Sequence, residues 1–302
     1  MDQSLAAFSE RNKLGQVQPR ACSWIEVRAI FETEPDDWSL AAGALAELGC
    51  NSSRIESSPP AIVSCVANIA GHLAKISKIQ EAMSRLGASS QEIKLIPDED
   101  WMDSFRKHFT SREIGEKFVV IPSWDAEQDF GNRLQIHLDP GQAFGTGDHP
   151  TTQMCLQILE KVDLEGKSVL DLGCGSGILA IGAKLLGAGT VVAADIELLS
   201  AKVATDNFAK NQVQIEAVAM AGMDGFSKDA AWDLIISNII SATLIRLAYE
   251  ISCNLNAGGK WIVSGIISAN WPDVLQEAQK FGLNLTEIQE ENGWVAACFT
   301  KP

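Results

Sequence analysis

The sequence predicts an α/β protein: a small N-terminal α/β sandwich of the ferredoxin-like kind, followed by a doubly wound, mostly parallel sheet with a C-terminal antiparallel hairpin. Three observations support this prediction. Strand-like and helix-like apolar periods alternate over residues 22–97 and again from residue 168 onwards. A glycine-rich segment lies between the first strand and the first helix of the second series. The chain then ends in two strand-like runs joined by Glu291-Asn292-Gly293, a hairpin turn.

The size and composition are those of a globular protein. With 302 residues, 46% hydrophobic and 21% charged, the chain can bury a core without disulfides or a structural metal. No apolar run reaches the roughly 18–20 residues of a membrane helix, and the first residues lack a secretory signal pattern. Seven scattered cysteines without a Cys-x-x-Cys pair fit a reducing compartment, and the four histidines are too far apart for a local zinc motif. We therefore expect a soluble, cytoplasmic protein with no metal and no membrane partner.

The charge balance restricts the class of partner. A formal net charge of −15 argues against direct binding of nucleic acid, because phosphate binding relies on clustered Lys and Arg. A basic partner protein fits this charge better. Acidity is also a common solubility device, and that explanation remains open.

The N-terminal part is expected to contain an arm and a small domain. Residues 1–21 are polar and lack periodicity, so we interpret them as a loose arm or a short helix. Residues 22–97 follow the order β-α-β-α-β with a further strand near residue 55, which is typical of a small α/β sandwich. The expected elements are a strand at 24–31, a helix at 36–49, a strand at 61–67, a helix at 73–87 and a strand at 92–97.

A change of character follows at residues 98–117, which are charged but carry Trp101, Phe105 and Phe109 at steps of four. This spacing stacks the three rings on one helical face. We expect a connector helix between two domains, and a part in gating an active site is the alternative.

The remaining residues, 118–302, are expected to form the second domain. The alternation of strands and helices from residue 168 is typical of a doubly wound sheet with helices on both faces. The expected strands are 118–124, 133–139, 168–173, 190–195, 214–220, 233–239 and 260–266, with the hairpin at 283–300. The expected helices are 151–162 and those ending at 186, 211 and 254.

The glycine-rich segment has the pattern Asp-x-Gly-x-Gly-x-Gly at 171–177. Gly173 and Gly175 permit positive φ and close approach of a ligand, and the helix that follows offers free N–H groups. A dinucleotide fingerprint has a third glycine where this chain has Ile178. A carboxylate at Asp171 would repel a pyrophosphate but suits the cationic amino group of S-adenosylmethionine. The segment therefore favours S-adenosylmethionine as the cofactor.

Polar residues end two later strands. Asp195 lies where an acid can accept both hydroxyls of a ribose, with a role as N-cap of the next helix as the alternative. Asn238 ends the fourth strand of the series, at the edge where ligands of open α/β sheets bind, with a turn role as the alternative.

Several of these segments together resemble one family. The run from Leu138 to Thr152, the glycine segment, Asp195 and Ser237-Asn238-Ile239 closely resemble the PrmA family, the methyltransferases of large-subunit ribosomal protein eleven. The resemblance implies a Rossmann-like class I methyltransferase sheet. It also implies methyl transfer from S-adenosylmethionine to the N-terminal α-amine and lysines of that ribosomal protein. In this organisation, residues 22–97 recognise the substrate and 118–302 form the methyltransferase domain.

The resemblance also assigns roles to single residues. It implies that Thr152, Gly173, Asp195 and Asn238 contact the cofactor, and that Phe144 and Thr146 form a lid over it. For methyl transfer to an amine, the side-chain oxygen of Asn238, or the strand-end carbonyls beside it, can orient the attacking amine. Asn238 cannot take the proton, so no catalytic base is assigned. The expected cofactor site consists of Phe144, Thr146, Thr152, Asp171, Gly173, Gly175, Asp195 and Asn238. The chain departs from the family at Asp148, where Thr is usual, and after Asn238, where Ile-Leu-Ala is usual; both positions lie near the expected substrate mouth.

Some alternatives remain open. His149 and Asp148 are the titratable residues of the family's loop and can relay a proton, but His149-Pro150-Thr151-Thr152 can equally build a helix start. The acceptor can be another protein, as in relatives that modify a mitochondrial electron-transfer flavoprotein, or a small amine. A catalytically silent cofactor-binding scaffold and a nicotinamide oxidoreductase are the remaining alternatives. We expect a monomer.

Overall fold

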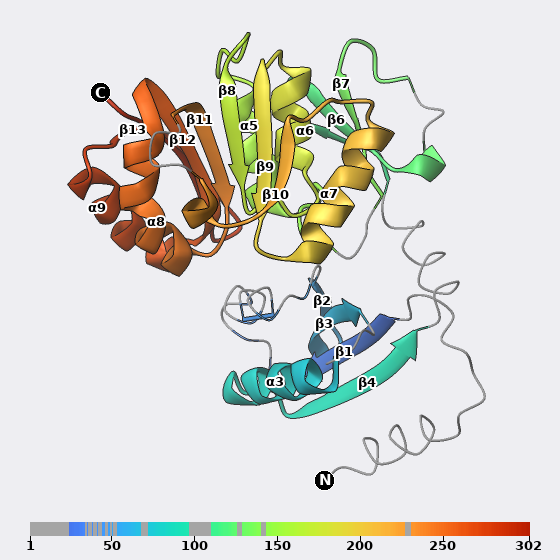
Figure 1. The fold of residues 1–302 in the computed structure, drawn as a ribbon. Helices are drawn as coiled ribbons and strands as arrows, with labels where there is room; N and C mark the ends of the chain where they lie inside the picture. The colour runs from blue at the N-terminus through green and yellow to red at the C-terminus, as the bar shows by residue number, and fades with distance from the viewer. Residues whose placement is uncertain are drawn as a thin grey trace. The chain divides into compact units, whose positions relative to one another are not determined.

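The structure is a computed structural model, and it describes residues 24–33, 35, 38, 41, 44–45, 48, 50, 53–67, 72–96, 110–125, 129–139, 143–226 and 231–302. The chain divides into two compact units, Met1–His108 and Phe109–Pro302, which are described separately here (Figure 1). The arm expected at 1–21 and the rings at 101, 105 and 109 lie outside the described residues.

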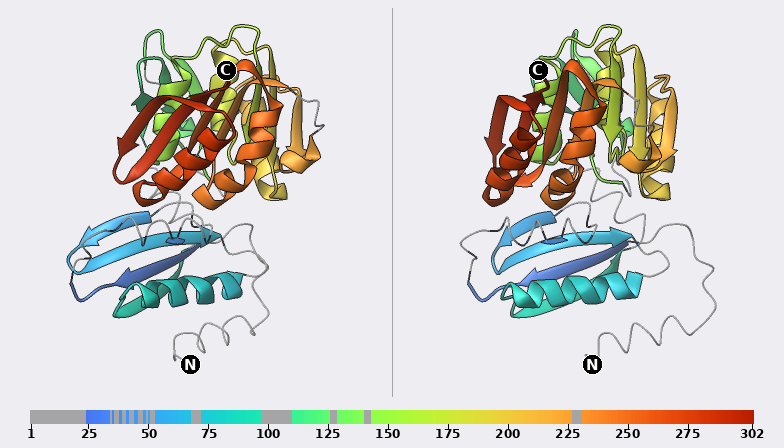
Figure 2. Two further views of the ribbon diagram at one scale, coloured as in Figure 1. Left: turned by 90° about the vertical axis from the view of Figure 1, so that its left-hand side faces the viewer. Right: turned by 60° about the vertical axis from the view of Figure 1, so that its left-hand side comes forward.

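The first unit contains an antiparallel sheet of four strands in the order β2-β3-β1-β4, and α3 lies along one face of it (Figure 2). Its elements are β1 (Trp24–Ile30), β2 (Ser53–Ser57), β3 (Pro60–Ala67), α3 (His72–Arg85) and β4 (Ser90–Ile96). Of the helix expected at 36–49, the described residues Ala41, Ala44 and Leu45 are helical. This order and direction of strands confirm the predicted ferredoxin-like sandwich.

Residue spacing explains how this unit closes. Ile25, Val27 and Ala29 alternate along β1 and are buried, while Ile76 and Ile79 on α3 are spaced one helical step apart and are buried against them. Period two along the strand and period 3.6 along the helix place one apolar face of each element in a shared core.

The second unit is built on a sheet of seven strands in the order β10-β9-β8-β11-β12-β14-β13. The five strands from β10 to β12 are parallel to one another. Strand β14 is antiparallel to both of its neighbours, β12 and β13, so it alone runs against the direction of the other strands. The strands are β8 (Ser168–Leu172), β9 (Thr190–Asp195), β10 (Ala217–Met220), β11 (Trp232–Asn238), β12 (Leu255–Ile267), β13 (Asn284–Glu291) and β14 (Trp294–Thr300). The chain order reverses between β8 and β11, and doubly wound sheets bind ligands beyond the carboxyl ends of such strands.

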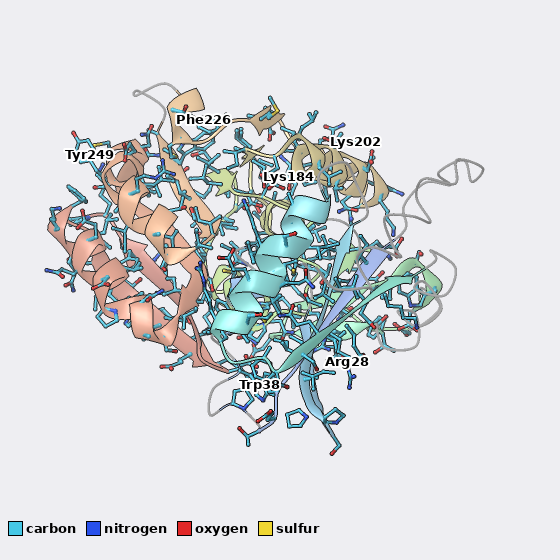
Figure 3. The ribbon with its side chains drawn as sticks, turned by 90° about the horizontal axis from the view of Figure 1, so that it is seen from below. Arg28, Trp38, Lys184, Lys202, Phe226 and Tyr249 are labelled. Carbon is cyan, nitrogen blue, oxygen red and sulfur yellow. The ribbon has the colours of Figure 1, made fainter. Side chains whose placement is uncertain are left out.

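Helices cover both faces of this sheet (Figures 1 and 2). Adjacent residues of β8 face opposite cores, because Val169 packs with the helices of one face and Leu170 with those of the other. The first face carries α5 (Pro150–Leu159), α6 (Ile178–Leu185) and α7 (Leu198–Lys210), and the second carries α8 (Ser241–Asn254) and α9 (Trp271–Lys280). Phe226, labelled in Figure 3, packs edge-on against Trp232 beside the second core, with ring centroids 6.1 Å apart.

A second, three-stranded sheet corrects one prediction. It consists of β5 (Arg112–Ile114), β6 (Phe118–Ile121) and β7 (Leu134–His137), so the helix expected over 98–117 is wrong at 112–114. Gly115 has a φ of +58°, which ends any helix there. The carboxylate of Glu160, at the end of α5, accepts hydrogen bonds from the N–H groups of Glu116 and Lys117 at 3.0 and 2.9 Å. A residue remote in sequence thus fixes the turn.

Other elements confirm or extend the predictions. The C-terminal hairpin turns at Asn292 and Gly293 with φ values of 51° and 77°, as a type I′ turn requires. Helix α9 was not predicted, and the strand expected at 118–124 stops at Ile121, before the short 3₁₀ helix Ser123–Asp125. Two further 3₁₀ turns are Met223–Gly225 and Ser268–Asn270. Among the described helices, none combines the length and apolar character that crossing a membrane would need.

Candidate active site

The glycine-rich segment after β8 packs directly against residues 143–149, here called the 143–149 loop. The N–H of Ser176 donates to the carbonyl of Phe144 at 2.9 Å, and Ser176 Oγ donates to the carbonyl of Gly145 at 2.5 Å. Gly175 has a φ of +53°, and a Cβ there would lie 2.5 Å from the carbonyl oxygen of Phe144. Only glycine permits this approach, so the two segments form one structural unit.

Asp171, on β8, lies beneath the start of α6 and is 1% exposed. Its Oδ2 accepts a hydrogen bond from the N–H of Ala180 at 3.0 Å, while its Oδ1 is buried and has no hydrogen-bond partner among the described residues. Burial raises the pKa of Asp171 to about 7; the Ala180 N–H opposes this rise and the nearby Asp195 carboxylate adds to it. A cation with N–H donors placed at Oδ1 would relieve this energetic penalty.

Asp195 is the last residue of β9, and its side chain accepts a hydrogen bond from the glycine-rich segment that follows β8. Its Oδ2 accepts from the N–H of Gly175 at 3.0 Å, and its Oδ1 accepts from the N–H of Glu197 at 2.9 Å. Helix α7 has Glu197 as its N-cap residue, so the N-cap role considered for Asp195 is wrong. Each carboxylate oxygen retains capacity for a further donor such as a ribose hydroxyl.

Asn238 points from the end of β11 toward α5. Its Nδ2 donates to Thr152 Oγ1 at 3.3 Å, and its Oδ1 is buried with no partner in the part of the chain that the structure describes. Thr152 is completely buried. The side chain therefore makes a tertiary contact across the edge of the sheet, and the turn role considered for Asn238 does not account for it.

The 143–149 loop ends at the start of helix α5. His149 is the N-cap of α5, its Nδ1 accepts from the N–H of Thr151 at 3.3 Å, and its ring centroid lies 4.8 Å from that of Trp294. Burial lowers the pKa of His149 to about 4, against a smaller opposing effect of Asp148. Asp148 is exposed and pairs with Arg112 at 2.8 Å. These contacts favour the helix-start alternative.

The structure therefore gathers the predicted residues at one edge of the sheet. The glycine-rich segment, Asp195, Thr152 and Asn238 meet there, and Phe144 lies over Gly175. Thr146 is half-buried in the same loop, and its contact with a cofactor stays a prediction. Gly173 has a φ of +78°, and a Cβ there would lie against Ile239 Cγ2.

Two apolar residues of this edge escaped the sequence analysis. Ile196 follows Asp195 and is 78% exposed, and Met220 pairs with Asp195 in the β10–β9 register and is 62% exposed. Exposed apolar side chains beside Asp195, the carboxylate predicted to bind a ribose, suit the flat face of a base. The position of Ile196 directly after the strand-ending acid was the available signal.

Comparisons with known proteins agree with this geometry. Residues 23–302 match the family model described as ribosomal protein L11 methyltransferase (PrmA). The chain is 35% identical over 231 residues to the ribosomal protein L11 methyltransferase of Herpetosiphon aurantiacus, covering 70% of this chain and 72% of that protein. It is 33% identical over 247 residues to that of Symbiobacterium thermophilum, covering 78% and 81%.

A solved structure extends the agreement to the fold. The crystal structure of ribosomal protein L11 methylase from Lactobacillus delbrueckii subsp. bulgaricus superposes with a TM-score of 0.59 at 29% identity, covering 64% of this chain and 99% of that one. Sequence, fold and the arrangement of the site lead to the same assignment. The chain belongs to the ribosomal protein L11 methyltransferase (PrmA) family.

Proposed function

We propose that this protein transfers methyl groups from S-adenosylmethionine to amino groups of ribosomal protein L11. One observation carries the proposal: two buried acceptor atoms that no described residue satisfies, Asp171 Oδ1 and Asn238 Oδ1, belong to strands that are neighbours in the sheet. Buried acceptors of this kind call for N–H donors. The amino group of the cofactor and the acceptor amine supply such donors, and the names of the relatives identify L11 as their acceptor.

The residues present fit this cofactor. Asp171 provides an anionic partner for the ammonium group, and Gly173 and Gly175 allow backbone approach. Asp195 would receive the ribose hydroxyls, and the 143–149 loop, which contains Phe144, packs against the glycine-rich segment. When bound, S-adenosylmethionine supplies a methyl group activated by its sulfonium.

The acceptor nitrogen must be neutral to attack. A lysine amine with a pKa of about 10.4 requires about 4–5 kcal/mol for deprotonation at pH 7, whereas an α-amine near 7.7–8.0 requires about 1 kcal/mol. The burial of Thr152 and of the Asn238 Oδ1 atom disfavours the ammonium form of an amine placed there and so lowers this requirement. Asn238 Oδ1 then accepts an N–H of the amine and directs its lone pair, so much of the catalysis is alignment.

Mass spectrometry of L11 after incubation with the enzyme and cofactor tests the proposal. We expect methyl-group mass increments on lysine-containing or N-terminal peptides of L11. If L11 gains no methyl group while a cell extract with labelled cofactor shows another labelled protein or a small amine, the acceptor is different. Cofactor binding without turnover on any extract would instead support the scaffold alternative.

Replacing His149 by Gln is expected to leave the pH profile of methylation between pH 6 and 9 unchanged, because burial keeps the imidazole neutral there. The same change should lower the unfolding free energy by about 1 kcal/mol, since Gln is a weaker N-cap acceptor. Rates across this pH range and denaturant titrations measure both effects. A shifted pH profile would indicate that His149 takes part in proton transfer.

The first unit is the proposed site of L11 recognition. It has its own sheet and core, and the sheet of the second unit uses its carboxyl edge for the cofactor. We expect removal of residues 1–97 to abolish methylation of L11 while cofactor binding persists. Methylation of L11 at the full rate by the shortened chain would contradict this role.

The proposed setting is a monomer in the cytoplasm. The described cysteines Cys50, Cys65, Cys155, Cys174, Cys253 and Cys298 are all free thiols, which supports a reducing compartment. Light scattering of the purified protein tests the monomer.

A further inference from the structure

The contact between Thr152 and Asn238 joins two distant parts of the chain. Thr152 lies in the first turn of α5, is completely buried, and its own N–H is satisfied by the carbonyl of His149 at 3.0 Å. Its Oγ1 is 3.3 Å from Nδ2 of Asn238, 86 residues later. A buried hydroxyl on a helix start thus meets the carboxamide of a strand end.

A carboxamide has two ends of nearly equal shape and opposite hydrogen-bonding character, because the NH₂ end donates and the oxygen accepts. Directing an attacking amine requires the oxygen. A hydroxyl that accepts from Nδ2 leaves Oδ1 as the free atom, as the structure has it. Without that hydroxyl, Nδ2 loses its partner and the amide can turn either end toward the acceptor.

We propose that Thr152 is a positioning residue that acts through Asn238, holding the carboxamide so that Oδ1 faces the acceptor amine. This inference rests on the proposed function and goes beyond the contact with the cofactor that the family resemblance implies for Thr152. It predicts that Thr152 increases the rate of methylation only when Asn238 is present, and that Thr152 has little effect on the affinity for the cofactor.

The same geometry discriminates between amines. Oδ1 can accept only from a nitrogen that still carries hydrogen, so it directs primary and secondary amines and has no hold on a tertiary amine. In each transfer the nitrogen lone pair forms the N–C bond and the C–S electron pair leaves with sulfur. In the first two transfers the surplus N–H proton then passes to water, whereas the third forms a quaternary ammonium and releases no proton. Thr152 and Asn238 therefore promote the first and second methylations of one nitrogen, and a third proceeds without their help.

A double-mutant cycle of Thr152→Val and Asn238→Ala tests the proposal. Thr152→Val keeps the side-chain volume and removes the hydroxyl, and we expect kcat on a primary amine of L11 to fall about tenfold, with the cofactor Kd changed less than about twofold. Thr152→Ser should restore most of the rate. The double variant should be no slower than Asn238→Ala alone, and transfer to a dimethylated peptide should be insensitive to Thr152→Val.

Ser264→Ala is the matched control. Ser264 is also completely buried, pairs with Asn238 in the β11–β12 register, and donates its hydroxyl to the carbonyl of Val295 at 2.9 Å. Its loss reports the general effect of deleting a buried hydroxyl at this edge. A double variant slower by the product of the two single effects, or a Thr152→Val effect confined to cofactor Kd, would overturn the proposal and place Thr152 on the cofactor.

A readout without turnover separates this inference from the proposed function. The NMR signals of the Asn238 side-chain amide, assigned by their loss in Asn238→Ala, should shift in Thr152→Val and stay in place in Ser264→Ala. An unshifted signal in Thr152→Val contradicts the positioning role. The expected shift together with an L11 substrate that is never methylated by the wild-type enzyme would contradict the proposed function alone.

Discussion

Replacing Asp171 by Asn is expected to weaken binding of S-adenosylmethionine about 100-fold, because a buried hydrogen bond to a charged group is worth about 1.5–3 kcal/mol. Asn can still accept from the N–H of Ala180, so the start of α6 is retained. The loss falls on Oδ1, the buried atom that has no partner within the described protein. Isothermal calorimetry measures the change, and an unchanged Kd would remove Asp171 from the cofactor site.

The same substitution should stabilise the protein when no cofactor is bound. Burial raises the pKa of Asp171 to about 7, whereas a carboxyl in the unfolded chain titrates near 3.9. Between these values the folded state binds more protons than the unfolded state, so stability falls as pH rises from about 4 to about 7. The accumulated loss is about 4 kcal/mol above the folded pKa. A neutral Asn avoids it.

Denaturant titrations of wild type and Asp171→Asn from pH 4 to pH 8 measure this effect. We expect the unfolding free energy of the variant to rise relative to that of the wild type as pH rises, and to be the larger of the two at pH 8. Asp206, which is exposed on α7, offers a matched control. The curve of unfolding free energy against pH for Asp206→Asn should run parallel to that of the wild type. If the curve for Asp171→Asn also ran parallel to that of the wild type, the raised pKa of the buried Asp171 carboxyl would be contradicted. Opposite signs for binding and stability would mark Asp171 as a residue kept for function.

Local patterns predicted most of the second sheet. Strands that are buried on both faces, such as β8 and β11, appear in the sequence as short apolar runs. The Asn292-Gly293 pair predicts its turn because these two residue types tolerate the positive φ angles that a type I′ turn requires. Strand β5 could not be predicted in this way, because Glu160 organises its turn from 44 residues away. Helix α9 was readable from the proline near its start and its buried Val274 and Ala278, and it was missed.

In the candidate site, too, the features set by local sequence could be predicted and those set by distant residues could not. The glycine-rich segment and Asp195 were predictable, because their chemistry depends on short spacings within one strand-turn-helix unit. The pairing of Asn238 with Thr152 was not, since it joins residues 86 positions apart. The state of His149 also depended on burial between Phe144 and Trp294, which no local pattern reports. Sequence spacing therefore located the site, and tertiary burial decided what its titratable groups can do.

Gly175→Ala is expected to abolish measurable cofactor binding, because the added Cβ would lie 2.5 Å from the carbonyl oxygen of Phe144. That atom belongs to the backbone, so the 143–149 loop must move and the hydrogen bond from the N–H of Ser176 to Phe144 must break. The N–H of Gly175 would also lose its alignment with Asp195 Oδ2. Calorimetry with S-adenosylmethionine and with its demethylated product measures the loss.

Gly166→Ala separates this contact from backbone strain. Gly166 has a similar φ of +68°, and a Cβ there meets nothing within 4 Å. An L-residue in the left-handed region costs about 1–2 kcal/mol at either site. Gly166→Ala should therefore lose that much unfolding free energy and bind the cofactor normally, whereas Gly175→Ala should lose more stability and fail to bind. Equal binding by the two variants would mean that the 143–149 loop does not need its contact with the glycine-rich segment to hold the cofactor.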